Sequence, residues 1–216
     1  MSNNPESAVL QPEIYTNPHD CTEAVLMLDN GHTVIGKHFG APIEKGEIQK
    51  GEVVFNTSPV GYPQILTDPS YRGQIVLMTH PMIGSYGIDP RSLESDRIWL
   101  SAFIVRQVVD EYSHHLASVS VSEFLEDQGI PGISEVDTRM LVRGIVTAGS
   151  PPLAVMACVN PGESIDMTAL RQRLTEVKTT TQMGEELVND VATKQMYDAG
   201  EVGWNHSHRF EKVDTE

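Results

Sequence analysis

The sequence predicts an α/β domain built on a mixed sheet, with a polar leader before it and a polar linker or tail after it. Short apolar runs rich in β-branched residues recur between glycine-bearing loops, a pattern typical of buried strands. Three later segments place apolar residues at spacings of three and four, which is typical of helices that pack on one face. The two ends of the chain carry neither pattern.

The strands are expected where the apolar runs occur. A strand over 23–28 is followed by Asp29-Asn30-Gly31, and a second strand over 33–39 returns from that turn. Because Asn-Gly accepts the positive φ angles of a type I′ turn, we expect a tight hairpin there. Further buried strands are predicted over 53–55, 75–78, 102–105 and 153–159.

The helices are expected where polar caps precede apolar residues. Ser120 and Glu123 match a capping box, so a helix should begin there and stop before Gly129. A second cap within 134–137 precedes apolar residues at helical spacing, and a third helix is predicted over 166–177. We therefore expect three parts: a flexible leader over 1–22, a domain over 23–177 and a linker or tail over 178–216.

The net charge of the chain limits the classes of partner that it is expected to bind. Thirty acidic residues against fifteen basic ones give a net charge of −15, which argues against binding nucleic acid or anionic membranes. Solubility is the simpler explanation of this charge, and a basic partner surface is the alternative. No apolar run approaches the ~18 residues of a membrane-spanning helix. No secretory signal or disulfide framework is evident, so we expect a cytoplasmic protein.

The most informative segment is 56–71, which reads Asn-Thr-Ser-Pro-Val-Gly-Tyr-Pro-Gln-Ile-Leu-Thr-Asp-Pro-Ser-Tyr. Here a strand-like run ends in two polar turns, and rigid scaffolds often carry function on such loops. The segment resembles a block in the amino-terminal domain of the small, glutamine-amidotransferase subunit of carbamoyl-phosphate synthetase. Similar blocks follow the family's order at 24–31, 74–87 and 130–139, with a weaker echo at 184–188.

This resemblance implies a compact β/β/α layered domain that docks on the large subunit of the synthetase. By the resemblance, the full small subunit hydrolyses L-glutamine through a cysteine thioester in a glutaminase domain. The large subunit then combines the ammonia with bicarbonate and ATP to make carbamoyl phosphate for pyrimidine and arginine synthesis. No cofactor is expected in this chain, whose own role would be to hold the glutaminase domain and wall off one side of the ammonia route.

Ser70 is the one site residue that the resemblance implies. In the family, the serine of the Thr-Asp-Pro-Ser-Tyr segment contacts the bound glutamine, and that segment stands intact here as 67–71. By turn chemistry alone, Ser70 would be a serine that bonds its own backbone. The nearby Pro59-Val60 and Pro63-Gln64 replace residues that are usually polar or threonine-like in the family, and each proline removes a backbone donor.

No catalytic residue is expected in this chain. The family's glycine-flanked cysteine nucleophile, with its His and Glu, has no counterpart in the sequence. Cys21 lies in the leader, and Cys158 ends an apolar run where a thiol is expected to be an inert, buried hydrophobe. Two rival interpretations remain: a stand-alone binding or scaffold domain that has lost the glutaminase half, and an independent enzyme using Ser70, Asp68 and a histidine.

A metal site is not expected either. His114 and His115 are adjacent, so their side chains should diverge, and His206 and His208 lie in the tail. Neither pair is accompanied by the cysteine and carboxylate ligands that a closed zinc site needs.

Overall fold

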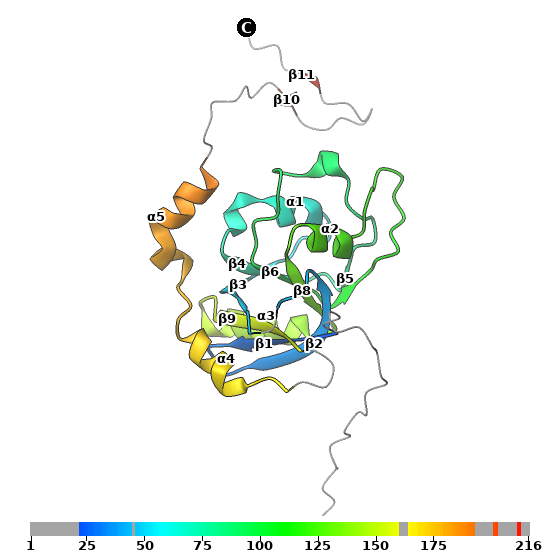
Figure 1. Ribbon diagram of the computed structural model, residues 1–216. Helices are drawn as coiled ribbons and strands as arrows, with labels where there is room; N and C mark the ends of the chain where they lie inside the picture. The colour runs from blue at the N-terminus through cyan, green and yellow to red at the C-terminus, as the bar shows by residue number, and fades with distance from the viewer. Residues whose placement is uncertain (1–21, 45, 160–163, 193–200, 203–210, 213–216) are drawn as a thin grey trace, which may run out of the picture.

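The fold is a mixed α/β structure centred on a seven-stranded sheet that closes into a barrel (Figure 1). The computed structural model describes residues 22–44, 46–159, 164–192, 201–202 and 211–212. Around the barrel the strands follow the order β1 (Glu23–Leu28), β2 (Thr33–Gly40), β8 (Pro131–Ser134), β6 (Ala102–Ile104), β4 (Gln74–Met78), β3 (Gln49–Asn56) and β9 (Leu153–Val159).

Both strand directions occur in this barrel, which confirms the predicted mixed sheet. The pairs β3–β4, β4–β6 and β6–β8 are parallel, whereas β1, β2 and β9 pair antiparallel with their neighbours. Closure of the sheet was not foreseen, because strand patterns specify which face of a strand is buried but not where the last strand pairs.

The α-helices lie around the barrel (Figure 1). The α-helices are α1 (Tyr62–Thr67), α2 (Val121–Asp127), α3 (Thr138–Ala148), α4 (Met167–Leu174) and α5 (Thr180–Val191). Two 3₁₀ turns, η1 (Pro69–Tyr71) and η2 (Pro90–Ser92), follow the α1 region. The short pairs are β5 (Met82–Ile83) with β7 (Gln107–Val108), and β10 (Glu201–Val202) with β11 (Glu211–Lys212).

Alternate residues along a strand pack into different hydrophobic clusters. Ile75 and Leu77 belong to one cluster that also takes in Leu141 and Ile145 of α3. Val76, between those strand residues, belongs to a second cluster that α1 and α2 cover. Successive side chains of a strand point to opposite faces, so one strand can line both cores. A third cluster joins the outer faces of β1 and β9 to α4.

The predicted β1–β2 hairpin is confirmed, but its expected turn type is wrong. Gly31 has a φ of +88°, whereas Asn30 is not among the described non-glycine residues with positive φ. A type I′ turn needs positive φ at both central positions. Instead the amide of Leu28 donates to the carbonyl of His32, and the Asn30 side chain accepts from the amide of His32. The loop is therefore wider than the expected two-residue turn.

The predicted helix caps are confirmed. The Ser120 hydroxyl accepts from the amide of Glu123, and the Glu123 carboxylate accepts from the amide of Ser120. Asp137 and Asp166 cap α3 and α4 in the same way through their carboxylates. Each cap satisfies a backbone donor that the first turn of a helix leaves unpaired.

Among the described elements of four or more residues, three were not predicted: α1, β8 and α5. The short α1 follows a glycine and contains a proline, and β8 contains both residue types, so local pattern favours a loop in each case. Helix α5 lies within the part read as a polar linker, where Gly184 has non-helical angles and kinks it. The predicted leader over 1–22 falls outside the described residues except for residue 22.

Candidate functional site

The segment that carries Ser70 is the connection between the parallel strands β3 and β4. Parallel neighbours require the chain to cross back before the second strand begins. Here the crossing contains α1, Asp68 and η1, and it is fastened to the rest of the domain at both ends of α1 and at η1 itself. Contacts of Asp68, Tyr71 and both ends of α1 hold the segment around Ser70 in place.

Asp68 shapes the turn that presents Ser70. Its Oδ1 accepts a hydrogen bond of 2.8 Å from the amide of Ser70, and its carbonyl accepts one of 3.1 Å from the amide of Tyr71. Pro69 then sits in the first turn of η1, where its missing N–H is not needed. The Ser70 side chain is exposed, and its hydroxyl makes no hydrogen bond to any residue that the structure describes. Only its backbone is used locally, so the hydroxyl is available to a ligand.

Two side-chain contacts fix the residues that follow Ser70. Asn56, at the end of β3, donates from Nδ2 to the Tyr71 hydroxyl at 3.0 Å. The Arg72 guanidinium donates through Nε and Nη2 to Oδ2 of Asp190 on α5, at 3.1 and 2.9 Å. Neither contact was predicted from the sequence, although a polar residue at the end of an apolar strand was a signal for the first.

The carboxyl end of α1 is held in place by hydrogen bonds of Thr67, which is fully buried. Its hydroxyl donates to the carbonyl of Pro63 at 2.9 Å and accepts from the amide of Glu94 at 2.9 Å. The Ser95 hydroxyl donates to the Thr67 carbonyl at 2.6 Å, and Trp99 Nε1 in turn donates to Ser95. The hydroxyl and the carbonyl of the residue that precedes Asp68 are thus both hydrogen-bonded, which restrains this end of α1.

The amino end of α1 is held by two stacked tyrosines. The rings of Tyr62 and Tyr86 lie 4.2 Å apart, and the Tyr86 hydroxyl accepts from the amides of Gly61 and Tyr62 at 2.6 and 3.3 Å. The Tyr62 hydroxyl donates to the carbonyl of Gly87. Burial raises the pKa of both phenols. Pro63 occupies the first turn of the helix, so this departure from the family pattern fits the local backbone.

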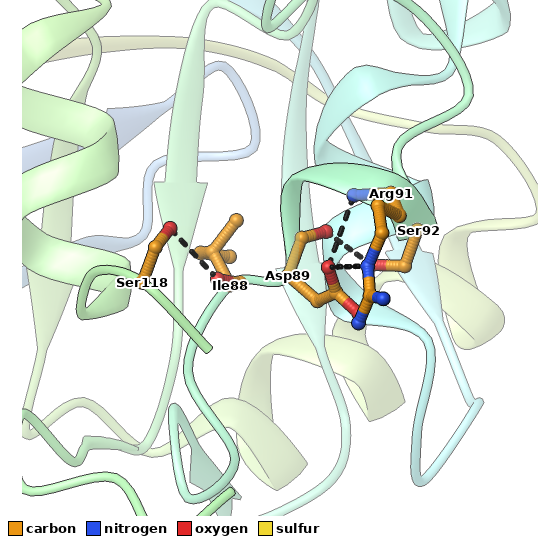
Figure 2. A network of polar contacts seen from close by, with 5 residues as sticks. All are labelled: Ile88, Asp89, Arg91, Ser92 and Ser118. Carbon is orange, nitrogen blue, oxygen red and sulfur yellow. Dashed lines mark hydrogen bonds and ion pairs between the residues drawn. The ribbon is translucent and has the colours of Figure 1, made fainter. Parts of the chain in front are cut away.

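A hollow of about 820 Å³ opens beside α1 and is lined in part by Gln64, Tyr86 and Asp89. Figure 2 shows Asp89 and Arg91 facing each other there, with Ser92 alongside. The hydrogen bonds from the Arg91 side chain hold the pKa of the Asp89 carboxyl below its usual range. Ser70 is not among the residues that line this hollow.

The described residues do not assemble the nucleophile and base of the rival enzyme interpretation around Ser70. The Asp68 carboxylate contacts the Ser70 amide, not its hydroxyl, and no described histidine bonds that hydroxyl. A serine acts as a nucleophile only when a base accepts its proton, so the described contacts do not equip Ser70 as a nucleophile.

The histidine and cysteine predictions have mixed outcomes. The rings of His114 and His115 lie 4.9 Å apart, so the expected divergence is wrong. Among the described residues there is no group of three or more His, Cys, Asp or Glu side chains placed to hold a metal ion. Cys158 is disulfide-bonded and only partly buried, which corrects the expectation of a buried thiol. Cys21, His206 and His208 lie outside the described residues.

Within the described part of the chain, no helix is both long and apolar enough to cross a bilayer.

Similarity to known proteins covers the segment that carries Ser70. Residues 26–155 match the model of the family described as "Carbamoyl-phosphate synthase small chain, CPSase domain". The chain is 44% identical over 174 residues to the "Carbamoyl phosphate synthase small chain" of Methanopyrus kandleri, which is 81% of this chain and 46% of that relative. The protein of the same name from Chlorobaculum tepidum is 41% identical over 81% of this chain and 44% of its own length.

A third relative of that name, from Syntrophotalea carbinolica, is 39% identical over 88% of this chain and 48% of its own length. The chain thus spans about half the length of the curated relatives it matches. Among solved structures, "Aminopeptidase from Aneurinibacillus sp. strain AM-1" aligns with a TM-score of 0.37 at 14% identity, covering 67% of this chain and 31% of that one. That likeness is too slight to bear on function.

Proposed function

This chain belongs to the carbamoyl-phosphate synthase small-chain family, and we propose that it serves as the non-catalytic, amino-terminal half of that subunit. In this role it completes the glutamine site with Ser70 and docks on the large subunit. In this proposal the glutaminase chemistry lies outside this chain, which spans about half the length of its relatives. ATP is used by the large subunit, and this chain needs no cofactor of its own.

The observation that carries the proposal is the free hydroxyl of Ser70 on a firmly held turn. A hydroxyl can donate one hydrogen bond and accept two, which suits the amide or the α-carboxylate of glutamine. Because the Asp68 cap and the Asn56–Tyr71 hydrogen bond fix the backbone around it, little entropy is lost when the ligand arrives. Ser70 does not line the hollow beside α1, and in this proposal the remaining glutamine contacts come from the glutaminase half.

Helix α5 supports the proposed arrangement of the two halves. It follows the domain in the chain and is anchored beside η1 by the Arg72–Asp190 ion pair. The end of α5 therefore lies near the turn that carries Ser70, which supports a glutamine site that this helix helps to border.

We also propose a role for this domain in the ammonia route. A domain that covers one side of the glutamine site excludes water from the path that ammonia takes to the large subunit. Excluding water at such a junction prevents loss of a reactive intermediate. The closed barrel provides a rigid wall for this purpose, because its sheet has no free edge.

Association with the large subunit tests this function against the alternative of a stand-alone scaffold domain. The full chain would be mixed with a carbamoyl-phosphate synthase large chain and passed over a size-exclusion column coupled to light scattering. The proposal predicts a stable complex containing one copy of each chain. Separate elution of the two chains, in the presence or absence of a relative's glutaminase half, would favour the scaffold alternative.

A further inference from the structure

The structure carries a second surface, on α3, that the proposed function does not use. A hollow of about 590 Å³ lies between this helix and the β1–β2 turn. Arg139 and Arg143 line it from α3, and Asn30 and His32 line it from the turn. We propose that this hollow, here called the α3 hollow, is a docking site for a carboxylate-rich segment of a partner protein.

The charge of the α3 hollow is opposite to that of the chain. Arg139 and Arg143 are exposed and lie four residues apart, so their guanidinium groups project from one side of α3. Neither makes an ion pair with any residue that the structure describes. In contrast, Arg72 and Arg91 are both paired with aspartates. Arg171 and Arg173 of α4 are also exposed without an ion pair to a described residue, so what distinguishes Arg139 and Arg143 is that both line one hollow.

The carboxylate inside the hollow does not cancel these cations. Asp137 lines the hollow, but its Oδ1 is occupied as the cap of α3, accepting from the amide of Met140 at 2.9 Å. One carboxylate stands against two guanidinium groups, so the local charge stays positive. Arginine forks match carboxylates in a bidentate geometry, which makes an acidic side chain the fitting ligand.

Gly144 supplies independent support for a partner. This glycine lines the hollow from the interior of α3, where glycine is less favourable than alanine by roughly 1 kcal/mol. Its angles are not in the left-handed region, and a Cβ built there has no described atom within 4 Å. Nothing in the described part of the chain therefore requires a glycine at this position. A partner backbone that approaches α3 closely would account for it.

The neighbouring residues complete a surface of the kind that binds polypeptides. Met140, one turn before Gly144, is 39% exposed and offers an apolar contact beside the arginines. Met side chains adapt to irregular partner surfaces. An apolar contact flanked by free cations fits an acidic segment that also carries apolar side chains, rather than a small inorganic anion.

A fluorescence anisotropy titration of the full chain tests this inference. The probe is a fluorescein-labelled peptide of alternating glutamate and leucine, and its control is the same peptide with glutamine in place of glutamate. At about 50 mM salt, where charges are weakly screened, we expect the glutamate peptide to bind at least about tenfold more tightly than the glutamine peptide. Equal binding of the two peptides, or no binding of either, would overturn the inference.

Matched variants locate the site. The double change Arg139→Gln with Arg143→Gln should weaken peptide binding about tenfold or more. The double change Arg171→Gln with Arg173→Gln removes the same charge from α4 and should change binding less than about twofold. An equal loss in both double variants would mean that net charge alone attracts the peptide, and it would refute the α3 hollow as the site.

Variants of Gly144 distinguish an effect on peptide binding from an effect on folding stability. Gly144→Ala should raise the thermal midpoint, because alanine favours the helix, and Gly144→Leu should weaken peptide binding about fivefold or more without lowering that midpoint. Unchanged peptide binding by Gly144→Leu would contradict the proposed close approach. These experiments use neither glutamine nor the large chain, so their outcome is independent of the role proposed for Ser70.

Discussion

The Thr180 hydroxyl donates a hydrogen bond of 2.6 Å to Oε2 of Glu52, joining α5 to β3 across 128 residues of sequence. Glu52 is only 9% exposed, so its carboxylate depends on this partner more than a surface carboxylate would. Nearby, the side chains of Met183 and Leu187 lie against Gly73. These contacts explain why a segment that reads as a polar linker is held against the barrel.

Thr180→Val should loosen α5. The change keeps the shape of the side chain but removes the donor to a nearly buried carboxylate, which costs about 1–3 kcal/mol. Hydrogen exchange of the α5 amides should accelerate at least about fivefold, whereas the barrel amides should change little. Thr181→Val, one residue along on the exposed side of the helix, is the control and should leave exchange unchanged. Equal effects of the two changes would show that Glu52 does not anchor α5.

Asp68→Ala should destabilise the turn that carries Ser70. The variant loses the acceptor for the Ser70 amide, and the loss of such a cap costs about 1 kcal/mol. The exchange rate of the Ser70 amide should rise about fivefold, and Asp68→Asn should restore most of the protection because asparagine also caps. An unchanged rate in Asp68→Ala would mean that the crossing segment holds η1 without this cap.

Tyr62 and Tyr86 should make the domain sensitive to alkali. Burial raises the pKa of each phenol in the folded state above the value of about 10 in the unfolded chain. The stability from their neutral forms is therefore fully present below about pH 10 and is lost as the pH rises toward the folded values. The thermal midpoint should fall above about pH 10, and this fall should be shallower in Tyr86→Phe. Tyr112→Phe is the control, and a shallower fall in that variant as well would contradict the assignment.

Asp89 should make the domain sensitive to acid, whereas the two tyrosines make it sensitive to alkali. The Arg91 side chain lowers the pKa of this carboxyl in the folded state below the value of about 3.9 in the unfolded chain. Its contribution to stability is present above about pH 4 and is lost as the pH falls through the folded value. Urea unfolding of Asp89→Asn should show lower stability at pH 7 and a weaker decline between about pH 4 and 2. Asp96→Asn, at an exposed position, should keep the wild-type profile.

The strands and caps could be predicted because their signals are local. The first strand is predicted at its observed bounds, since five buried residues follow one another between two polar ends. The Ser120 capping box needs only residues within one helical turn. In contrast, closure of the barrel depends on β3 pairing with both β4 and β9, which are far from each other in the sequence. No local pattern specifies such a pairing.

The candidate site could likewise be predicted only where its contacts are local in the sequence. The turn around Ser70 is evident in the Asp-Pro-Ser sequence, because that sequence caps and starts a 3₁₀ turn by itself. The partners that hold it are not evident: Arg72 and Asp190 are 118 residues apart, and Thr67 is satisfied by Glu94 and Ser95. The assignment of glutamine to Ser70 came from the resemblance of whole blocks, since turn chemistry alone gave a structural serine.

The most direct test of the central claim is the glutamine dependence of a reconstituted synthetase carrying Ser70→Ala. The full chain would be combined with a relative's glutaminase half and large chain, and carbamoyl phosphate would be measured with glutamine or ammonia as nitrogen donor. Loss of one hydrogen bond to bound glutamine predicts a KM for glutamine that is higher by about threefold to tenfold. Ammonia-dependent synthesis should be unchanged, and so should both activities of Ser58→Ala, an exposed serine of the same crossing segment. An unaltered KM for glutamine in Ser70→Ala would contradict the account.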